Sequence, residues 1–404
     1  MSQGSLTAKD AANYLGIKVE TLYAYVSRGL LTSQDQNKTR QKLYRKTDLD
    51  RLQQSSRTSR KTLQKLSSPI SWGAPTFDTA VTKIIETTPH YRGNSLEKLL
   101  SYNLNFENIC ELLWSGTLEL SPIHWESGKT KSLIHSLPTN SYPDFHHYAV
   151  KLTMFFIHEF ALTTKSPNSG TNDYHLAKHL LHYISQQISH LRSQKPNTKQ
   201  PTKTIAEALT VSLGTTANRE SIINQLLIIC ADYGLSSTTF VARIAASTGA
   251  DLFSCLTAAT GALYEPQRGA TFAKIETLTQ QFQDEKSVQK LAKLNHDSTG
   301  DIPGFYAEGI GDKRAQLILQ LAATLPKSKS TNLIDHYLQI GQENFSQVPQ
   351  VELALVRICE GLKLPKGSAS AIFLISRISG WCAHVFEQRQ SGFSFAPSQR
   401  YFGR

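Results

Sequence analysis

The sequence feature that most constrains the fold is a helical spacing of apolar residues, which continues from Thr82 nearly to the C-terminus. In NLIDHYLQIGQENF (332–345) and AIFLISRISGWCAHVFEQ (371–388), apolar side chains recur every three or four residues and so line one face of an α-helix. INQLLIICA (223–231) is apolar almost throughout, which predicts a helix buried on several faces, as in a large dimer. The fold class is therefore predicted to be mostly α, with strands expected only in a small N-terminal domain.

The positive charge of the chain is concentrated at its N-terminus. The formal net charge is +11, and residues 1–66 hold 13 Lys and Arg against 5 Asp and Glu. The remaining residues hold 30 basic and 27 acidic side chains. This asymmetry indicates a polyanion partner for an N-terminal domain over residues 1–66, which precedes a large domain over residues 67–404.

Residues 6–31, LTAKDAANYLGIKVETLYAYVSRGLL, predict two short helices joined by a glycine-containing turn. Thr7 is expected to cap the first helix, Gly16 to end it, and the second to begin near Val19. Such a helix-turn-helix places its second helix in the major groove of DNA. The candidate base contacts on this recognition helix are Lys18, Thr21, Tyr23, Tyr25 and Arg28.

A polar loop and the element LYR follow, before a helix start predicted at Thr47-Asp48. This segment resembles the winged helix-turn-helix of the MerR and excisionase-like class, in which a β-hairpin wing follows the recognition helix. The resemblance implies that cationic wing residues contact DNA phosphates, which position the protein without reading sequence. These residues are Lys38, Arg40, Lys42 and Arg45. The alternative is a basic helical pair that only solubilises the protein.

Other features narrow the class of protein. The N-terminus MSQGSLTAKD lacks the basic and apolar segments of a signal peptide, and no uninterrupted apolar run approaches the roughly 20 residues that span a membrane. The cysteines are odd in number and widely spaced, as in reduced core thiols, and lack a CxxC pair: Cys110, Cys230, Cys255, Cys359 and Cys382. We expect a cytoplasmic protein with no metal site and no membrane contact.

Ordered motifs over about 320 residues resemble the citrate synthase family. They are HYRGNSLEKLL (90–100), FENICELLWSGTL (106–118), CADYGLSSTTFVAR (230–243), PGF (303–305) with DKR (312–314), VPQVELAL (348–355) and RISGWCAHVFEQ (377–388). The resemblance implies a large all-α domain with a smaller subdomain inserted near residues 260–370. It also implies the condensation of an acyl-CoA with a 2-oxo acid.

That condensation needs a carboxylate base, a donor that holds the enol oxygen and an acid that polarises the ketone. By the resemblance, Glu352 stands at the position of the base, one methylene longer than the family's aspartate. Arg268 stands where the family has the enol-holding histidine, and Ala307 where it has the ketone-polarising histidine. Tyr233 replaces the histidine that grips the substrate. The catalytic histidines are therefore replaced, and the candidate catalytic residues are Glu352 and Arg268.

Two of the family's carboxylate-binding arginines are kept, as Arg314 and Arg377, while Ala396 stands at the third position. The candidate substrate-binding residues are thus Arg314, Arg377 and Tyr233. An alternative is that Arg314, Arg377 and Glu352 form a buried ion-pair network inherited from an older site. His384 is expected to be a core or interface histidine rather than a catalyst.

These features suit three hypotheses. The favoured one is a DNA-binding regulator, a homodimer whose degenerate citrate-synthase-like domain senses a carboxylate or an acyl-CoA. The second is an active acyltransferase with Glu352 as base and Arg268 as enolate stabiliser. The third is a scaffold subunit that forms a heteromer with a competent paralogue. An acyl-CoA is a possible ligand or substrate in each case, and no other cofactor is expected.

Overall fold

The computed structural model describes residues 5–15, 19, 22, 26, 33–36, 39–46, 49, 77–125, 145–164, 173–192, 202–263, 269–300, 302–306, 311–392 and 394–395. These residues form two compact units, residues 1–78 and 79–404, and each unit is considered by itself. The boundary predicted at residue 66 falls within residues 50–76, outside the described residues, so it stays a prediction.

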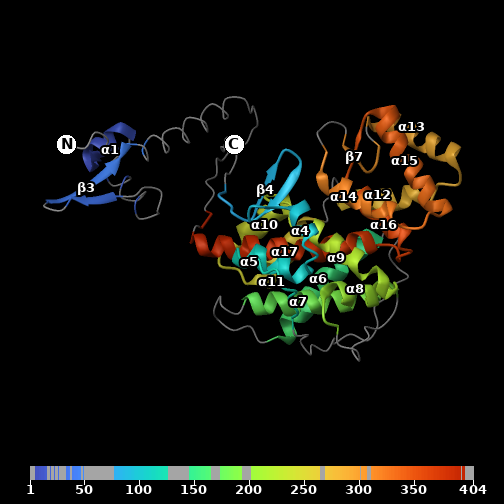
Figure 1. Cartoon of the computed structure of the whole chain (residues 1–404), viewed down its shortest axis with the longest axis horizontal. Helices are drawn as coiled ribbons and strands as arrows, with labels where there is room; N and C mark the ends of the chain where they lie inside the picture. The colour runs from blue at the N-terminus through green and yellow to red at the C-terminus, as the bar shows by residue number, and fades with distance from the viewer. Residues whose placement is uncertain are drawn as a thin grey trace, which may run out of the picture. The chain divides into compact units, whose positions relative to one another are not determined.

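The N-terminal unit combines a helical core with a β-hairpin. Its elements are β1 (Ser5–Thr7), α1 (Ala8–Leu15), β2 (Ser33–Gln36) and β3 (Thr39–Arg45), and the antiparallel sheet has the order β1-β3-β2 (Figure 1). The predicted cap is present, because the Thr7 hydroxyl oxygen accepts a hydrogen bond from the Asp10 amide at 3.3 Å. Leu22 is fully buried and Val26 packs on the same small core. The first predicted helix and the hairpin of the predicted wing are therefore present, whereas the turn at Gly16, most of the second helix and the helix start at Thr47-Asp48 lie outside the described residues.

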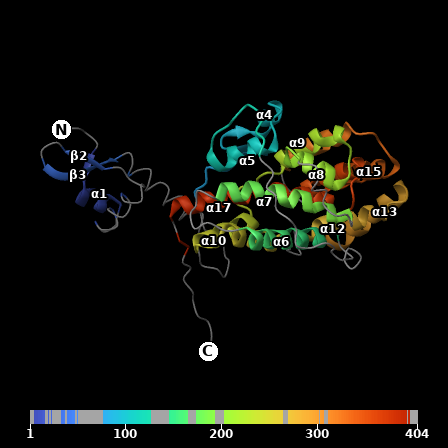
Figure 2. The same ribbon diagram turned by 90° about the horizontal axis from the view of Figure 1, so that it is seen from below.

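The large unit is mostly α, as predicted. Its described helices are α4 (Leu96–Ser101), α5 (Phe106–Ser115), α6 (Phe145–Thr163), α7 (Asp173–Gln187), α8 (Ile205–Leu213), α9 (Glu220–Ile229), α10 (Ser237–Ser247), α11 (Leu252–Ala262), α12 (Gly269–Thr279), α13 (Glu285–Thr299), α14 (Lys313–Ala323), α15 (Lys329–Phe345), α16 (Val351–Gly361) and α17 (Ser368–Ser391). Helices α12 to α16 gather at one end of the unit (Figures 1 and 2). The inserted subdomain near residues 260–370 remains a prediction that this grouping suits.

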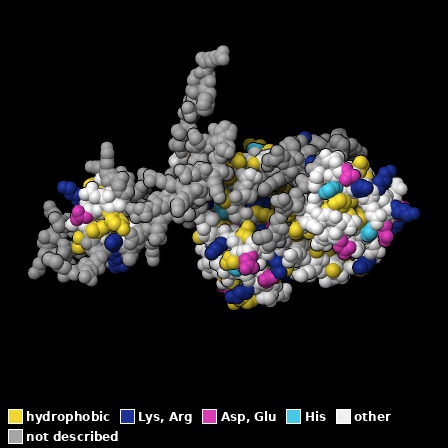
Figure 3. Space-filling model, turned by 90° about the horizontal axis from the view of Figure 1, so that it is seen from above, with side chains coloured by type: hydrophobic (Ala, Val, Ile, Leu, Met, Phe, Trp, Pro, Cys, Tyr) yellow, Lys and Arg dark blue, Asp and Glu magenta, His cyan; other side chains and the backbone are white. Residues whose placement is uncertain are grey.

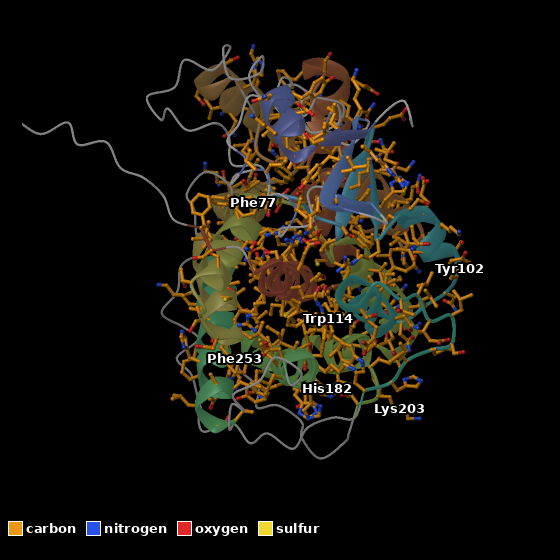
Figure 4. All side chains as sticks on the ribbon, turned by 90° about the vertical axis from the view of Figure 1, so that its left-hand side faces the viewer. Phe77, Tyr102, Trp114, His182, Lys203 and Phe253 are labelled. Atoms are coloured by element: carbon orange, nitrogen blue, oxygen red, sulfur yellow. The ribbon has the colours of Figure 1, made fainter. Side chains whose placement is uncertain are left out.

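Helix α17 forms the centre of the large unit. It packs against α5, α6, α7, α9, α10 and α11, and Figure 4 looks nearly along its axis, with Trp114 and Phe253 on helices around it. Among the described residues, α17 has the length and apolar composition of a membrane span, and its most apolar stretch is wholly buried in the protein. This span is not evident in the sequence, because serine, arginine and histidine interrupt its apolar run.

Short strands in the large unit were not predicted. The strands β4 (Thr82–Ile85), β5 (Thr88–Tyr91) and β6 (Asn94–Ser95) form an antiparallel sheet, and β7 (Phe305–Tyr306) pairs with β8 (Val348–Pro349). Strands of two to four residues are too short to show an alternating apolar pattern. The β7–β8 pair brings the PGF segment beside the start of α16, where Gly304 has a φ of +90° and a Cβ would lie 2.8 Å from Leu353. This contact helps to set the position of Glu352.

Candidate ligand site around Asp232

A pocket lies where the N-terminal ends of α10 and α16 approach the middle of α17. Its empty volume is about 560 Å³, including the open mouth. The residues that line it are Tyr233, Ser236, Ser237, Thr238, Ala262, Leu263, Phe272, Glu352, Phe373 and Arg377. The structure therefore brings Tyr233, Glu352 and Arg377 together, although they lie far apart in the sequence.

Asp232 is the anchor of the site. It lies just after α9 and is fully buried. Its Oδ1 accepts a hydrogen bond from Arg377 Nη1 at 2.9 Å, and its Oδ2 accepts one from the Gly234 amide at 2.8 Å and lies 3.2 Å from His384 Nε2. Burial alone would raise the pKa of Asp232, but the facing His384 and Arg377 hold this pKa well below its usual range. Asp232 is thus a buried carboxylate at neutral pH.

Arg377 connects this anchor to the pocket. Its guanidinium donates to the carbonyl of Ala231 at 3.3 Å and to the Thr239 hydroxyl at 3.0 Å, besides the bond to Asp232. The side chain is 2% exposed and still forms part of the pocket wall. Gly380, one turn farther along α17, leaves the space for this arrangement, because a Cβ there would lie 2.3 Å from Asp232 Oδ1.

Both terminal nitrogens of the Arg314 guanidinium are hydrogen-bonded within the protein. Its Nη1 lies 3.2 and 3.1 Å from the carboxylate oxygens of Asp312, and its Nη2 donates to the main-chain carbonyl of Asp232 at 2.5 Å. The side chain is buried and does not belong to the described pocket wall. Arg314 and Arg377 therefore make ion pairs within the protein, with Asp312 and Asp232, and the alternative that joins both arginines to Glu352 stays a prediction. A substrate-binding role for either stays a prediction.

Tyr233 lies between the two arginines. Its ring centroid is 4.0 Å from the Arg314 guanidinium carbon and 5.3 Å from that of Arg377, and the ring stands edge-on to Phe373. The hydroxyl is buried and has no hydrogen-bond partner among the described residues. Burial raises the pKa of Tyr233 well above its usual value, so the hydroxyl remains a neutral donor.

Glu352 is the candidate base that the structure describes. It lies in the first turn of α16, and its side chain forms part of the pocket wall. Arg268, Ala307 and Ala396 lie outside the described residues, so the geometry of an enol-holding group or a third arginine is not given. The described part of the pocket provides the Glu352 carboxylate, the Tyr233 phenol and the Arg377 guanidinium.

The described pocket lies in the part of the chain that matches the citrate synthase, C-terminal domain family, residues 70–397. This chain belongs to the citrate synthase family. Residues 5–57 match a second family, the helix-turn-helix domain. The chain thus joins a citrate-synthase-like domain to a helix-turn-helix domain.

Similar proteins agree with this assignment. The chain is 25% identical to 2-methylcitrate synthase 2 of Corynebacterium glutamicum over 356 residues, 80% of this chain and 92% of that protein. It is 27% identical to citrate synthase 2 of Bacillus subtilis over 45% of this chain and 50% of that protein. The fold matches citrate synthase of Thermoplasma acidophilum in a ternary complex with carboxymethyl coenzyme A and oxaloacetate, with a TM-score of 0.63, 20% identity, and coverage of 82% and 94% of the two chains. It also matches citrate synthase of Thermotoga maritima, with a TM-score of 0.62, 19% identity, and coverage of 84% and 96%.

Asp232 is a site residue that was not predicted, although it lies in the motif CADYGLSSTTFVAR (230–243). The signal was a carboxylate directly after INQLLIICA, because a charge that ends a buried helix needs buried partners. His384 was expected to be a core or interface histidine, and it is a fully buried partner of Asp232. Its Nδ1 lies 3.9 Å from the Glu387 carboxylate, which in turn accepts a hydrogen bond from the Ala80 amide at 2.7 Å.

The candidate DNA contacts are described only in part. Lys18, Thr21, Tyr23, Tyr25, Arg28, Lys38 and the side chain of Arg40 lie outside the described residues. Lys42 and Arg45 are exposed on β3, the second strand of the hairpin. The hairpin therefore carries at least two cations outward, as a phosphate-contacting wing requires.

Proposed function

We propose that this chain is a DNA-binding regulator of the citrate synthase family that responds to a ligand in the pocket around Tyr233 and Arg377. The observation that carries the proposal is the state of the two retained arginines. Each makes an ion pair with a buried or half-buried aspartate, and the Tyr233 ring covers the face of one of them. A condensation needs several cationic and acidic groups that are free to act on the substrate. Arginines already paired with aspartates are better suited to binding a ligand than to that reaction.

The N-terminal unit supplies the DNA-binding half of the proposal. It carries most of the excess positive charge, and Lys42 and Arg45 are exposed on its hairpin. The large unit differs, because Lys and Arg side chains on the face in Figure 3 are interspersed with Asp and Glu. A polyanion is therefore expected to bind the N-terminal unit.

A run of contacts could carry the ligand's effect to the start of the large unit. Arg377 contacts Asp232, Asp232 contacts His384, and His384 lies beside Glu387. Glu387 holds the amide of Ala80, immediately after the residues that connect the two units. A ligand that draws Arg377 away from Asp232 would weaken these contacts as far as Ala80. Coupling between two sites requires a ligand that binds one arrangement of such contacts more tightly than the other.

A homodimer would complete the regulator. Two-fold symmetry would present two helix-turn-helix domains to a pseudo-palindromic DNA site. A heteromer with a catalytically competent paralogue would bring an enzyme to DNA instead. Co-expression with such a paralogue followed by mass measurement separates the two assemblies.

DNA binding is tested by fluorescence anisotropy of the full chain with a random-sequence duplex at several salt concentrations. Replacing Lys42 and Arg45 together by alanine should lower the slope of log affinity against log salt by about 1.8, since each phosphate contact contributes about 0.9. The matched control replaces Lys290 and Lys293, exposed on α13 of the large unit, and should leave the slope unchanged. An equal slope for native and hairpin variant would refute the predicted wing contact.

The second candidate is an active acyltransferase, which the position of Glu352 in the pocket wall favours. Glu352 would take the α-proton of the thioester, the carbanion would attack the ketone of a 2-oxo acid, and hydrolysis would release the thiol. Thiol release from acetyl-CoA and propionyl-CoA with oxaloacetate is therefore measured beside Glu352→Gln. If the native chain releases thiol and Glu352→Gln does not, the chain is an enzyme with Glu352 as its base, and the proposal of a regulator with a degenerate site is wrong.

A further inference from the structure

We infer that the pocket accepts a ligand with a single carboxylate and a short apolar chain, and that Tyr233 excludes dicarboxylates. The inference rests on the proposed function only in taking this pocket as the ligand site. Its support is that Arg377 forms part of the described pocket wall whereas Arg314, whose guanidinium lies under the Tyr233 ring, does not, although both side chains are almost completely buried.

Arg377 can offer hydrogen-bond donors to a ligand. A guanidinium has five N–H groups, and the bonds to Ala231, Asp232 and Thr239 use three of them among the described residues. Because the side chain forms part of the pocket wall, a carboxylate in the pocket can reach the remaining edge. Paired donors of this kind favour a carboxylate through bidentate hydrogen bonding.

Arg314 lies outside the described pocket wall. The Asp312 carboxylate and the Asp232 carbonyl accept from its two terminal nitrogens, and its Nε is buried with no hydrogen-bond partner among the described residues. The face of the guanidinium is covered by the Tyr233 ring at 4.0 Å. Among the described residues, a second ligand carboxylate would therefore meet an aromatic ring and the neighbouring Glu352 side chain instead of a cation, which makes its desolvation unfavourable.

The rest of the wall indicates the remainder of the ligand. Ala262, Leu263, Phe272 and Phe373 form an apolar side, where a short alkyl chain would be buried. The Tyr233 hydroxyl is a buried donor with no partner among the described residues, and it can donate to a keto or carboxylate oxygen. A short 2-oxo monocarboxylic acid satisfies all of these groups at once.

The test is isothermal titration of the full chain with pyruvate and 2-oxobutanoate against oxaloacetate and 2-oxoglutarate. The native protein should bind the monocarboxylates at least tenfold more tightly, a difference that corresponds to 1.4 kcal/mol. Tyr233→Ala uncovers Arg314 and should raise the affinity for the dicarboxylates about tenfold or more. Tyr233→Phe keeps the ring, so the preference for monocarboxylates should remain, even with lower affinity for both classes.

Several results would overturn the inference. One is native binding of oxaloacetate as tight as that of pyruvate, and another is a Tyr233→Ala variant whose selectivity equals that of the native chain. Absence of binding for all four acids to both proteins would also refute it. Circular dichroism confirms that each variant is folded, with Tyr233→Phe as the conservative check. Because DNA binding is measured separately, its loss would contradict the regulator and leave the selectivity result intact.

Discussion

The pH dependence of stability should depend in part on one buried carboxyl group that does not belong to the described pocket wall. Glu107 on α5 is 1% exposed, its Oε1 accepts the Ile205 amide at 2.6 Å, and its Oε2 is buried with no partner among the described residues. Burial raises the pKa of Glu107 from 4.5 to about 7. A carboxyl group with a raised folded-state pKa contributes stability below its unfolded pKa, and this contribution is lost as the pH rises through the folded pKa.

The magnitude follows from the two pKa values. Each pKa unit corresponds to about 1.4 kcal/mol, so the rise at Glu107 lowers the free energy of unfolding by about 3 kcal/mol between pH 4 and pH 8. Glu107→Gln keeps an oxygen acceptor for the Ile205 amide and removes the ionisation. Between pH 4 and pH 8, the unfolding free energy of the variant should therefore rise by about 3 kcal/mol relative to that of the native chain.

The assay is urea unfolding of the large unit, followed by tryptophan fluorescence at pH 4.5, 6 and 8. Glu285→Gln, at an exposed position on α13, is the control and should show no such pH-dependent difference. If the Glu107→Gln difference from the native chain is the same at all three pH values, Glu107 does not change its protonation on unfolding. The reasoning from burial would then be wrong.

Two further predictions concern the contacts of α17. Gly380→Ala should lower the free energy of unfolding by about 1–3 kcal/mol, since its Cβ would lie 2.5 Å from the Ala231 carbonyl, while the control Gly261→Ala, whose Cβ meets only Met154 at 3.9 Å, should be tolerated. Equal thermal midpoints for the two alanine variants would contradict this packing. Glu387→Ala should speed amide hydrogen exchange at Ala80, which loses its acceptor. If amide exchange at Ala80 is as slow in the variant as in the native chain, the hydrogen bond from the Ala80 amide to Glu387 is not formed in solution.

Much of the architecture was predictable because it is encoded by residues that lie close together in the sequence. The apolar spacing of three and four residues predicted the mostly α fold, and Thr7 as a cap predicted the start of α1. The motifs assigned Glu352, Tyr233, Arg314 and Arg377 to positions of the family's site, and the roles implied by that assignment stay predictions. The short strands of the large unit were missed, because they depend on pairing rather than on a local pattern.

Periodicity, charge and motif order in the sequence were enough to predict the helices, the basic N-terminal domain and the candidate residues. What these residues face depends on how the helices pack in the folded protein. Asp232 meets Arg377 and His384 across 145 and 152 residues of chain, and the Tyr233 ring covers Arg314. Helical periodicity extends over a few turns, whereas these pairings arise when buried charges find partners as separate helices pack. For that reason two arginines that look equivalent in the sequence differ in the folded protein, where Arg377 reaches the pocket and Arg314 does not.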